Sequence, residues 1–449
     1  MSIEPVRKPF ELCPLNELLE RSARSFPSRI ALRKREKQGW NEYTYGQFID
    51  AVKKVAGFLR YSGYQKGVAL SHRNIVSDIN SIYQSVIFDE TDRFFSVLPI
   101  SHAYENTAGN LLPLSVAASI TYSQPLKPRE MLEDIQDAKP TIMLAVPLLL
   151  EKLLAGIRKK MDNVPLHIKG LLGLIKGSAT ILNACRQGLG GRLLYKNIRE
   201  RMGLENLRFF VSGGAALSPW VQKGMEGFGF VVLQGYGLTE AAPVATVNPP
   251  HKQKANSVGP AIPDTKIKII DPDAEGIGEI TIKGPNVFKE YYKNEGATKD
   301  VFLPDGFFLT GDIGYIDEEG FLYITGRKKS VIITRSGLNI FPEEIESITL
   351  ESPFIEEILV IKGQNRITGD EEVHAIIYPN FDAIDEYCSD NKTVTGPDEQ
   401  LKMLLQREID ERSKKLADYK KIRSFTVRNE EFPKTSTNKV KRYLFESQN

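Results

Sequence analysis

The sequence predicts an α/β protein with a large N-terminal domain at 1–326 and a smaller α+β C-terminal domain at 327–449. Residues 71–256 alternate apolar runs of strand length with amphipathic helical segments, which is typical of a parallel sheet covered by helices. Residues 257–326 hold shorter strand-like runs divided by turn signals, which indicates a small antiparallel barrel. Residues 1–70 precede the sheet as a short first subdomain.

The composition limits the class of protein. The chain has 449 residues, 41% of them hydrophobic, which suits two or three globular cores. Its net charge of +2 gives no overall electrostatic case for nucleic acid. Residues 1–26 lack the apolar core of a signal peptide, and the longest apolar run, 142–150, is too short to span a membrane. Three widely spaced cysteines suit a reducing cytosol, so we expect a cytoplasmic protein.

Apolar runs and helical spacing predict the elements of the first half. The predicted strands are Ile30–Leu32, Tyr43–Tyr45, Phe94–Leu98, Ala118–Tyr122, Thr141–Ala145, Leu207–Ser212 and Phe230–Leu233. Helices are predicted at about 46–60 and 74–86, across most of 147–203, and from Ser218-Pro219 onward.

The second half has closer spacing. The strands predicted for its first part are Lys266–Ile270, Glu279–Lys283, Phe307–Leu309, Gly314–Ile316 and Phe321–Ile324. Further strands are predicted at 331–334, 355–362, 372–378 and 422–428, with helices from Pro342 and across about 397–417.

The run Gln234-Gly235-Tyr236-Gly237-Leu238-Thr239-Glu240 directly follows a predicted strand. Its glycines allow the backbone to approach a phosphate, and Tyr236 offers a flat face to a base. Thr239 offers a hydroxyl to a phosphate oxygen, and Glu240 offers the hard oxygen that Mg²⁺ prefers. A tight turn after a core strand is the alternative, and Gly-x-Gly alone would not exclude it. With the aromatic, the hydroxyl and the carboxylate together, the run predicts a nucleotide site.

This run resembles the adenine and magnesium motif of the adenylate-forming superfamily, which contains acyl-CoA synthetases, luciferases and the adenylation domains of peptide synthetases. The resemblance implies that residues 234–237 and Thr239 contact ATP, that Thr239 assists catalysis and that Glu240 binds Mg²⁺. The turn Gly213-Gly214-Ala215-Ala216-Leu217 resembles the family's S-G-G-A-P-L turn. We therefore expect Gly214, Ala215 and Ala216 along the adenine edge.

Two motifs further along the chain resemble the family's ribose site and hinge. Thr310-Gly311-Asp312 resembles its T-G-D, which implies that Asp312 accepts hydrogen bonds from both ribose hydroxyls. Thr325-Gly326-Arg327-Lys328-Lys329 resembles the hinge between its two domains. Arg327 would contact ribose or phosphate during catalysis, and Lys329 would be the pivot of a mobile C-terminal domain. A solvated basic linker is the alternative.

Two motifs in the C-terminal domain complete the resemblance. Ser336-Gly337-Leu338-Asn339 resembles the loop that lines the pantetheine tunnel, which implies that Ser336, Gly337 and Asn339 contact coenzyme A. The run 433–442 resembles the P-K-T-x-x-G-K catalytic loop. Lys439 then falls on the lysine that bridges the substrate carboxylate and the α-phosphate, where a mobile ammonium stabilises developing charge. A basic C-terminal tail is the alternative.

The phosphate loop departs from the family pattern. Residues 61–74 keep Ser62-Gly63, Lys66-Gly67-Val68 and Ser71-His72-Arg73-Asn74, but they lack the threonine pair and the second glycine. Several strand-helix units that the family places before this loop are also missing, which is typical of an internal deletion on the order of a hundred residues. Lys66 supplies charge to the phosphates in one interpretation and is a surface lysine in the other.

The segment 99–107 resembles the family's L-P-L-x-H-x-x-E, whose histidine and aromatic lie beside the acyl pocket, so His102 and Tyr104 are expected to line it. The helical insertion at 147–203 resembles the long-chain fatty acyl-CoA synthetase branch. Its basic residues within 150–201 suit either peripheral contact with an anionic membrane or an ordinary solvated helix face.

The resemblance implies a ligase with fatty acid, ATP, Mg²⁺ and coenzyme A as its ligands. It would form acyl-AMP and pyrophosphate, and then acyl-CoA and AMP. Three alternatives stay open. The acyl group passes to a carrier protein, or the chain binds nucleotide and acyl group without turnover, or the gap in the sequence leaves a chain that folds poorly.

Overall fold

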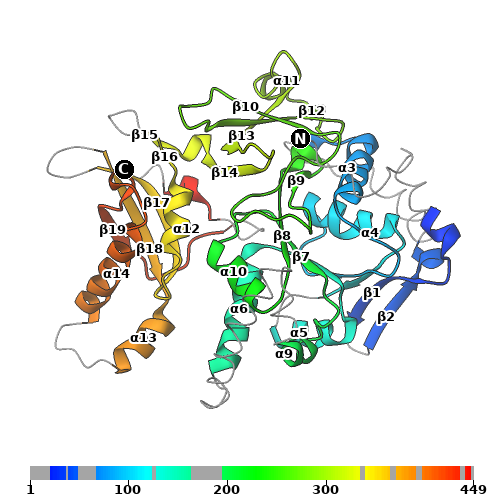
Figure 1. Cartoon of the computed structure of the whole chain (residues 1–449), viewed down its shortest axis with the longest axis horizontal. Coiled ribbons are helices and arrows are strands. Elements are labelled where there is room, and N and C mark those ends of the chain that lie inside the picture. Colours follow the sequence, from blue (N-terminus) through cyan, green and yellow to red (C-terminus); the bar gives the residue numbers. More distant parts are fainter. Residues whose placement is uncertain are drawn as a thin grey trace. The chain divides into compact units, whose positions relative to one another are not determined.

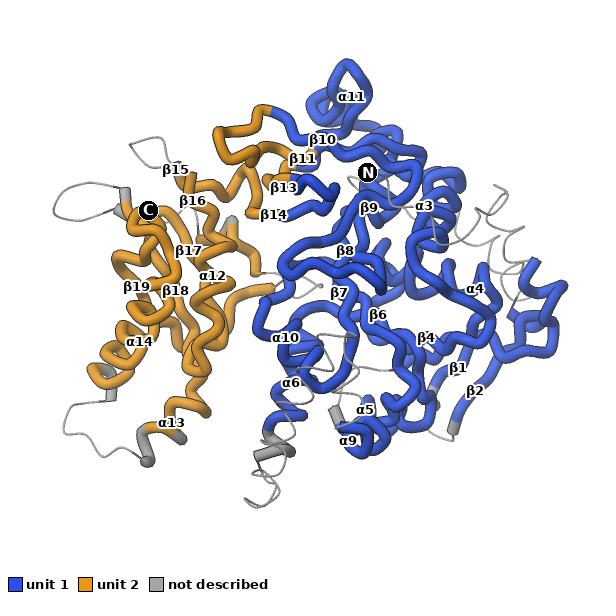
Figure 2. Tube along the Cα trace, viewed as in Figure 1, with its two compact units in different colours: residues 1–270, 281–310, 316–323 blue, residues 271–280, 311–315, 324–449 orange. Residues whose placement is uncertain are grey.

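The computed structural model describes residues 21–36, 39–48, 67–123, 128–162, 195–333, 339–364, 371–390, 397–434 and 440–445. The chain forms two compact units, shown in different colours in Figure 2. Unit 1 comprises residues 1–270, 281–310 and 316–323, and unit 2 comprises residues 271–280, 311–315 and 324–449. The domain boundary expected at 326/327 stays a prediction.

Unit 1 is built on an eight-stranded sheet with the strand order β2-β1-β5-β4-β6-β7-β8-β9 (Figure 1). The strands are β1 Ile30–Glu36, β2 Gly39–Thr44, β4 Arg93–Ser96, β5 Ser119–Tyr122, β6 Ile142–Ala145, β7 Phe209–Ser212, β8 Val232–Gly237 and β9 Val244–Val247. The six central strands pair in parallel, while β2 and β9 pair antiparallel at the two edges. The predicted α/β fold class is therefore confirmed.

Helices cover both faces of this sheet because neighbouring strand residues point to opposite sides. Phe94 and Phe209 join one core with α3 His72–Ser85, the π-helix η2 Glu105–Leu111 and α4 Leu112–Ser115. Their neighbours Phe95 and Phe210 join a second core on the other face. The helices of that face are α5 Pro128–Ala138, α6 Pro147–Asp162 and α10 Pro219–Gly227.

Helix α3 begins at the S-H-R-N run. Ser71 caps it by accepting a hydrogen bond from the Asn74 backbone, and the Asn74 side chain accepts one from the Ser71 backbone. This reciprocal pair has the geometry of a capping box. The helix is buried on its polar side as well, where Ser77, Asp78 and Asn80 lie. The S-H-R-N run, which follows the phosphate segment, thus has the structural role of capping α3.

Two smaller sheets follow in the chain. One has the order β10-β11-β13-β14, with β10 Lys266–Ile270, β11 Gly278–Lys283, β13 Phe308–Ile316 and β14 Leu322–Arg327. The other pairs β12 Glu290–Tyr291 with β3 Val68–Ala69 in unit 1. The short helices α9 Lys196–Arg201 and α11 Glu295–Lys299 also belong to unit 1.

The C-terminal part of unit 2 has its own core around a three-stranded sheet. The strands are β17 Ile355–Gln364, β18 Glu371–Pro379 and β19 Ser424–Val427. The helices are α12 Pro342–Thr349, α13 Phe381–Asp390 and α14 Pro397–Ser413, and β15 Ile332–Ile333 pairs with β16 Asn339–Ile340. This arrangement agrees with the α+β character predicted for this part of the chain.

The structure corrects several predicted elements. The strands predicted at Phe307–Leu309 and Gly314–Ile316 are one strand, β13, because strand pairing continues past Gly311, whose φ is 72°, and Asp312. Strand β9, helix α13 and the π-helix η2 were not predicted. Most of the predicted helix at 46–60, from residue 49 on, and much of the basic segment 150–201 lie outside the described residues. Within the described residues, no helix combines the length and apolar character needed to cross a bilayer.

Candidate active site

The strand order of the large sheet indicates where one side of the candidate site lies. From β4 the chain passes to β5 on one side, whereas β6 lies on the other side of β4. In open α/β sheets, ligands bind beyond the carboxyl ends of the strands at such a reversal. The segment after β4 carries His102 and Tyr104 to this edge, and the turn after β7 begins at Gly213.

Tyr104 meets the glycine turn that follows β7. Its hydroxyl donates a hydrogen bond to the Val211 carbonyl over 2.9 Å. A Cβ at Gly213 would lie 3.0 Å from the Tyr104 ring, so glycine permits this contact. The residues after it, Gly214, Ala215 and Ala216, are exposed, and Gly214 has a φ of 84°. A predicted pocket residue and the predicted adenine turn are thus in contact.

Glu105, which sequence analysis left without a role, is a buried carboxyl next to Tyr104. It is 1% exposed and accepts a hydrogen bond from Ser96. Its Oε2 has no hydrogen-bond partner among the described residues, and burial raises the pKa of Glu105 to about 7, against the lowering effect of Ser96. His102 is half-buried beside this segment, and its carbonyl accepts from the Asn106 backbone at 2.9 Å. The available sequence signal for Glu105 was the final glutamate of the L-P-L-x-H-x-x-E motif.

The turn at 234–240 packs tightly against the segment that follows it, which includes Pro243 and β9. A Cβ at Gly237 would lie 1.8 Å from the Pro243 carbonyl oxygen, so the β8–β9 crossing requires glycine there. Gln234 is buried and donates to Gln222 over 2.8 Å, which turns its amide toward α10. Tyr236 is half-buried, Gly235 pairs with Val247 of β9, and Thr239 is exposed at the start of a 3₁₀ turn.

One segment, which carries Phe288 and Tyr291, holds both the backbone carbonyl and the side chain of Glu240. The Tyr291 hydroxyl donates to Glu240 Oε1 over 2.9 Å, and the Phe288 backbone N–H donates to the Glu240 carbonyl over 2.7 Å. Burial and the hydrogen bond to Glu240 raise the pKa of Tyr291, so its phenol stays a donor. Asn286 supports the same turn by donating to the carbonyls of Ala241 and Val244. The contact from Tyr291 was not found from the sequence because 51 residues separate it from Glu240.

The surroundings of Glu240 fit one magnesium ion that is bound mainly by nucleotide phosphates. Glu240 Oε2 makes no hydrogen bond or ion pair to any described residue. No group of three or more His, Cys, Asp or Glu residues in the described ranges is arranged to hold a metal. Mg²⁺ at nucleotide sites is bound by one or two carboxylates together with phosphates and water. A single carboxylate with one unpaired oxygen matches that donor set.

In unit 2, Asp312 and Arg327 lie on neighbouring strands. Asp312 is 4% exposed and pairs with the Arg327 Nε at 2.9 Å, while the Arg327 side chain is 62% exposed. Lys329 lies in the following 3₁₀ turn, and Asn339 is exposed on β16. The residue expected at the ribose, Asp312, and the residues expected at the hinge, Arg327 and Lys329, therefore belong to β13, to the end of β14 and to the turn after it.

Four candidate residues lie outside the described residues: Lys66, Ser336, Gly337 and Lys439. The structure describes residues that flank two of them. Tyr292 donates its backbone N–H to the Gly67 carbonyl over 2.8 Å. Lys434 and Val440 form an antiparallel bridge on either side of the expected catalytic loop. The roles of all four residues stay predictions.

Comparison with known proteins decides the family. The profile of the AMP-binding enzyme family matches residues 62–292, just over half of the 449 residues. The chain belongs to the AMP-binding enzyme family. Its matched region contains Tyr236, Glu240 and Tyr291, so the contacts described in unit 1 lie within the region that matches the family.

This AMP-binding enzyme is similar to curated fatty acid ligases. It is 31% identical over 392 residues to a chloroplastic long-chain-fatty-acid–[acyl-carrier-protein] ligase of Arabidopsis thaliana, across 74% of this chain and 52% of that protein. It is 32% identical over 335 residues to long-chain-fatty-acid–CoA ligase 4 of Saccharomyces cerevisiae, across 71% of this chain and 47% of that protein. The AMP-binding enzyme thus spans about half the length of the curated relatives it matches.

Solved structures share the fold of this AMP-binding enzyme. ATP-bound MatB from Rhodopseudomonas palustris matches with a TM-score of 0.64 and 26% identity, across 86% of this chain and 65% of that chain. O-succinylbenzoate coenzyme A synthetase from Bacillus subtilis, in complex with AMP, matches with a TM-score of 0.70 and 20% identity, across 96% of this chain and 98% of that chain. The second likeness supports the fold alone.

Proposed function

We propose that this AMP-binding enzyme activates a long-chain fatty acid with ATP and then transfers the acyl group to coenzyme A. The fatty acid carboxylate attacks the α-phosphate, which gives acyl-AMP and releases pyrophosphate. The thiol of coenzyme A then attacks the acyl carbonyl, which gives the thioester and releases AMP. The observation that carries this proposal is the side chain of Glu240, which accepts a hydrogen bond from Tyr291 on β12, the strand that pairs with β3 just after Lys66.

The proposal assigns the nucleotide to three groups of residues. The exposed turn 214–216 and Tyr236 would bind adenine, as an open backbone edge and an aromatic face. Asp312 would accept the ribose hydroxyls and Arg327 would contact ribose or phosphate. Thr239, Lys66 and Mg²⁺ on Glu240 would hold the phosphates.

The remaining candidate residues concern the acyl group, the acceptor and the motion between half-reactions. His102 and Tyr104 would line the acyl pocket, and Lys439 would stabilise the charge that develops between carboxylate and α-phosphate. Ser336, Gly337 and Asn339 would line the coenzyme A tunnel. Lys329 would be the pivot for rotation of the C-terminal part.

The acyl class and the acceptor rest on relatives rather than on geometry. Both curated relatives described above carry long-chain fatty acid in their names, one with coenzyme A and one with an acyl-carrier protein as acceptor. Product analysis with each acceptor distinguishes these two possibilities. A coenzyme A thioester as the main product supports the proposal, and acylated carrier protein as the main product replaces its acceptor.

The departure of the phosphate segment favours a second candidate, a protein that binds nucleotide and acyl group without turnover. Residues 61–74 lack the threonine pair and second glycine with which the family's loop contacts the triphosphate, and this supports an internal deletion. The test is pyrophosphate release with ATP, Mg²⁺ and a fatty acid, beside Lys439→Ala. Release that the substitution abolishes supports the ligase, whereas ATP binding without release supports the second candidate.

A further inference from the structure

Tyr291 fixes the side chain of Glu240. Its hydroxyl donates to Glu240 Oε1 over 2.9 Å, and the neighbouring Phe288 fixes the backbone of the same glutamate over 2.7 Å. A carboxylate side chain otherwise rotates about several bonds, and a held conformation removes that freedom before a ligand binds. The remaining oxygen, Oε2, therefore points in a direction that Tyr291 determines.

Tyr291 is itself held by packing and a hydrogen bond. Its ring contacts Phe288 with 4.8 Å between the ring centroids, and Phe288 packs against Phe308 at 5.2 Å. Its backbone N–H donates to the Thr298 hydroxyl over 3.0 Å. The phenol thus approaches Glu240 from a rigid base rather than from a loose loop.

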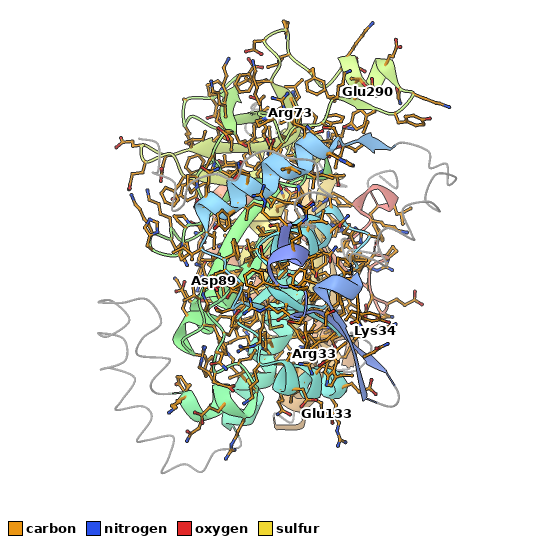
Figure 3. The ribbon with its side chains drawn as sticks, turned by 90° about the vertical axis from the view of Figure 1, so that its right-hand side faces the viewer. Arg33, Lys34, Arg73, Asp89, Glu133 and Glu290 are labelled. Atoms are coloured by element: carbon orange, nitrogen blue, oxygen red, sulfur yellow. The ribbon has the colours of Figure 1, made fainter. Side chains whose placement is uncertain are left out.

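The strand that carries Tyr291 also pairs with the strand after the phosphate segment. Tyr291 lies opposite Val68, Glu290 lies opposite Ala69, and the Tyr292 backbone donates to Gly67. The same segment is joined to α3, because the Asn74 side chain donates to the carbonyls of Pro285 and Val287, both over 2.8 Å. Figure 3 shows Glu290 on β12 and Arg73 on α3 at the same end of unit 1.

We propose that Tyr291 is a positioning residue for the metal-dependent nucleotide site. Its hydroxyl holds Glu240 so that Oε2 meets a Mg²⁺ ion on the nucleotide phosphates, and its strand fixes the distance between Glu240 and the segment after Lys66. This inference rests on the proposed function. Partners that orient a metal ligand typically contribute 10- to 100-fold to metal affinity or activity.

The test replaces Tyr291 by phenylalanine, which keeps the ring and removes the hydroxyl. The Mg²⁺ concentration that half-saturates ATP binding is measured by calorimetry, and the unfolding temperature is measured without ligand. We expect the Mg²⁺ requirement to rise about tenfold or more with little change in that unfolding temperature. Tyr292→Phe is the matched control, because Tyr292 is 56% exposed and its side chain makes no hydrogen bond to Glu240.

A second measurement separates positioning from general packing. If Tyr291 acts through Glu240, then Tyr291→Phe has no further effect on the Mg²⁺ requirement in a Glu240→Gln background. An effect of the same size in both backgrounds overturns the inference, as does an unchanged requirement in the single variant. A wild-type chain that binds no Mg²⁺·ATP overturns the proposed function as well, so the two failures are distinguishable.

Discussion

Glu240 and Asp312 are the two carboxylates expected at the nucleotide, and they differ in what already holds them. The side chain of Glu240 has a neutral phenol as its hydrogen-bond donor and no ion pair among the described residues. Asp312 is buried and paired with the Arg327 guanidinium at 2.9 Å. A carboxylate without a cationic partner can attract an incoming cation, whereas the guanidinium already compensates the charge of a carboxylate that pairs with arginine. The partner, rather than the residue type, thus favours metal for Glu240 and neutral hydroxyls for Asp312.

The largest effect is expected for Glu240→Gln, which keeps an acceptor for Tyr291 but removes the charge. Pyrophosphate release should fall on the order of 100- to 1000-fold, as when other charge-stabilising groups are removed from active sites. Binding of AMP in the presence of a chelator should stay unchanged, because no metal is involved. An unaltered Mg²⁺ dependence of pyrophosphate release would contradict the assignment of the metal to Glu240.

A smaller effect with a different signature is expected for Asp312→Asn. Hydrogen bonds to a charged group contribute about 1.5 to 3 kcal/mol, so AMP affinity should fall roughly 10- to 100-fold. This loss should be the same with Mg²⁺ and with a chelator, which calorimetry measures directly. Arg327→Gln is the companion variant, because it removes the arginine and leaves the carboxylate. A loss that depends on Mg²⁺ would assign the metal to Asp312 instead.

Local sequence patterns predicted the nucleotide turn but not its supports. The run 234–240 and the turn 213–217 could be recognised because their residues are adjacent in the chain. Tyr291 comes 51 residues after Glu240, and long-range contacts bring that segment to the site, among them the pairing of β12 with β3 and the hydrogen bond from Phe288 to the Glu240 carbonyl. Spacing rules do not include such long-range pairing.

The same limit explains two residues whose local interpretation was incomplete. Gly237 was predicted to allow the approach of a phosphate, yet the Pro243 carbonyl alone already requires a glycine there. Gly311-Asp312 has the composition of a turn but continues β13, because sheet pairing overrides local preference. Local residue type therefore identified the motifs, while tertiary contacts decided what each residue touches.

Glu105 provides a third carboxylate for the comparison, one that is buried and has no cation among the described contacts. Its pKa is raised from 4.5 to about 7, mainly by burial, so the folded state keeps the proton longer than the unfolded state does. The resulting stabilisation is fully present below pH 4.5 and is lost as the pH rises through 7. Activity is expected to change least here, because the effect lies in stability.

The test is Glu105→Gln, which removes the titration and keeps the acceptor for Ser96. Between pH 5 and pH 8, the wild-type free energy of unfolding should fall by about 2 kcal/mol relative to the variant. Glu133→Gln is the control, because it makes the same change at a carboxylate whose side chain is 46% exposed. Parallel pH profiles for wild type and Glu105→Gln would mean that Glu105 ionises as freely as an exposed carboxylate. The absence of a cationic partner would then not explain how the buried carboxyl of Glu105 in unit 1 behaves.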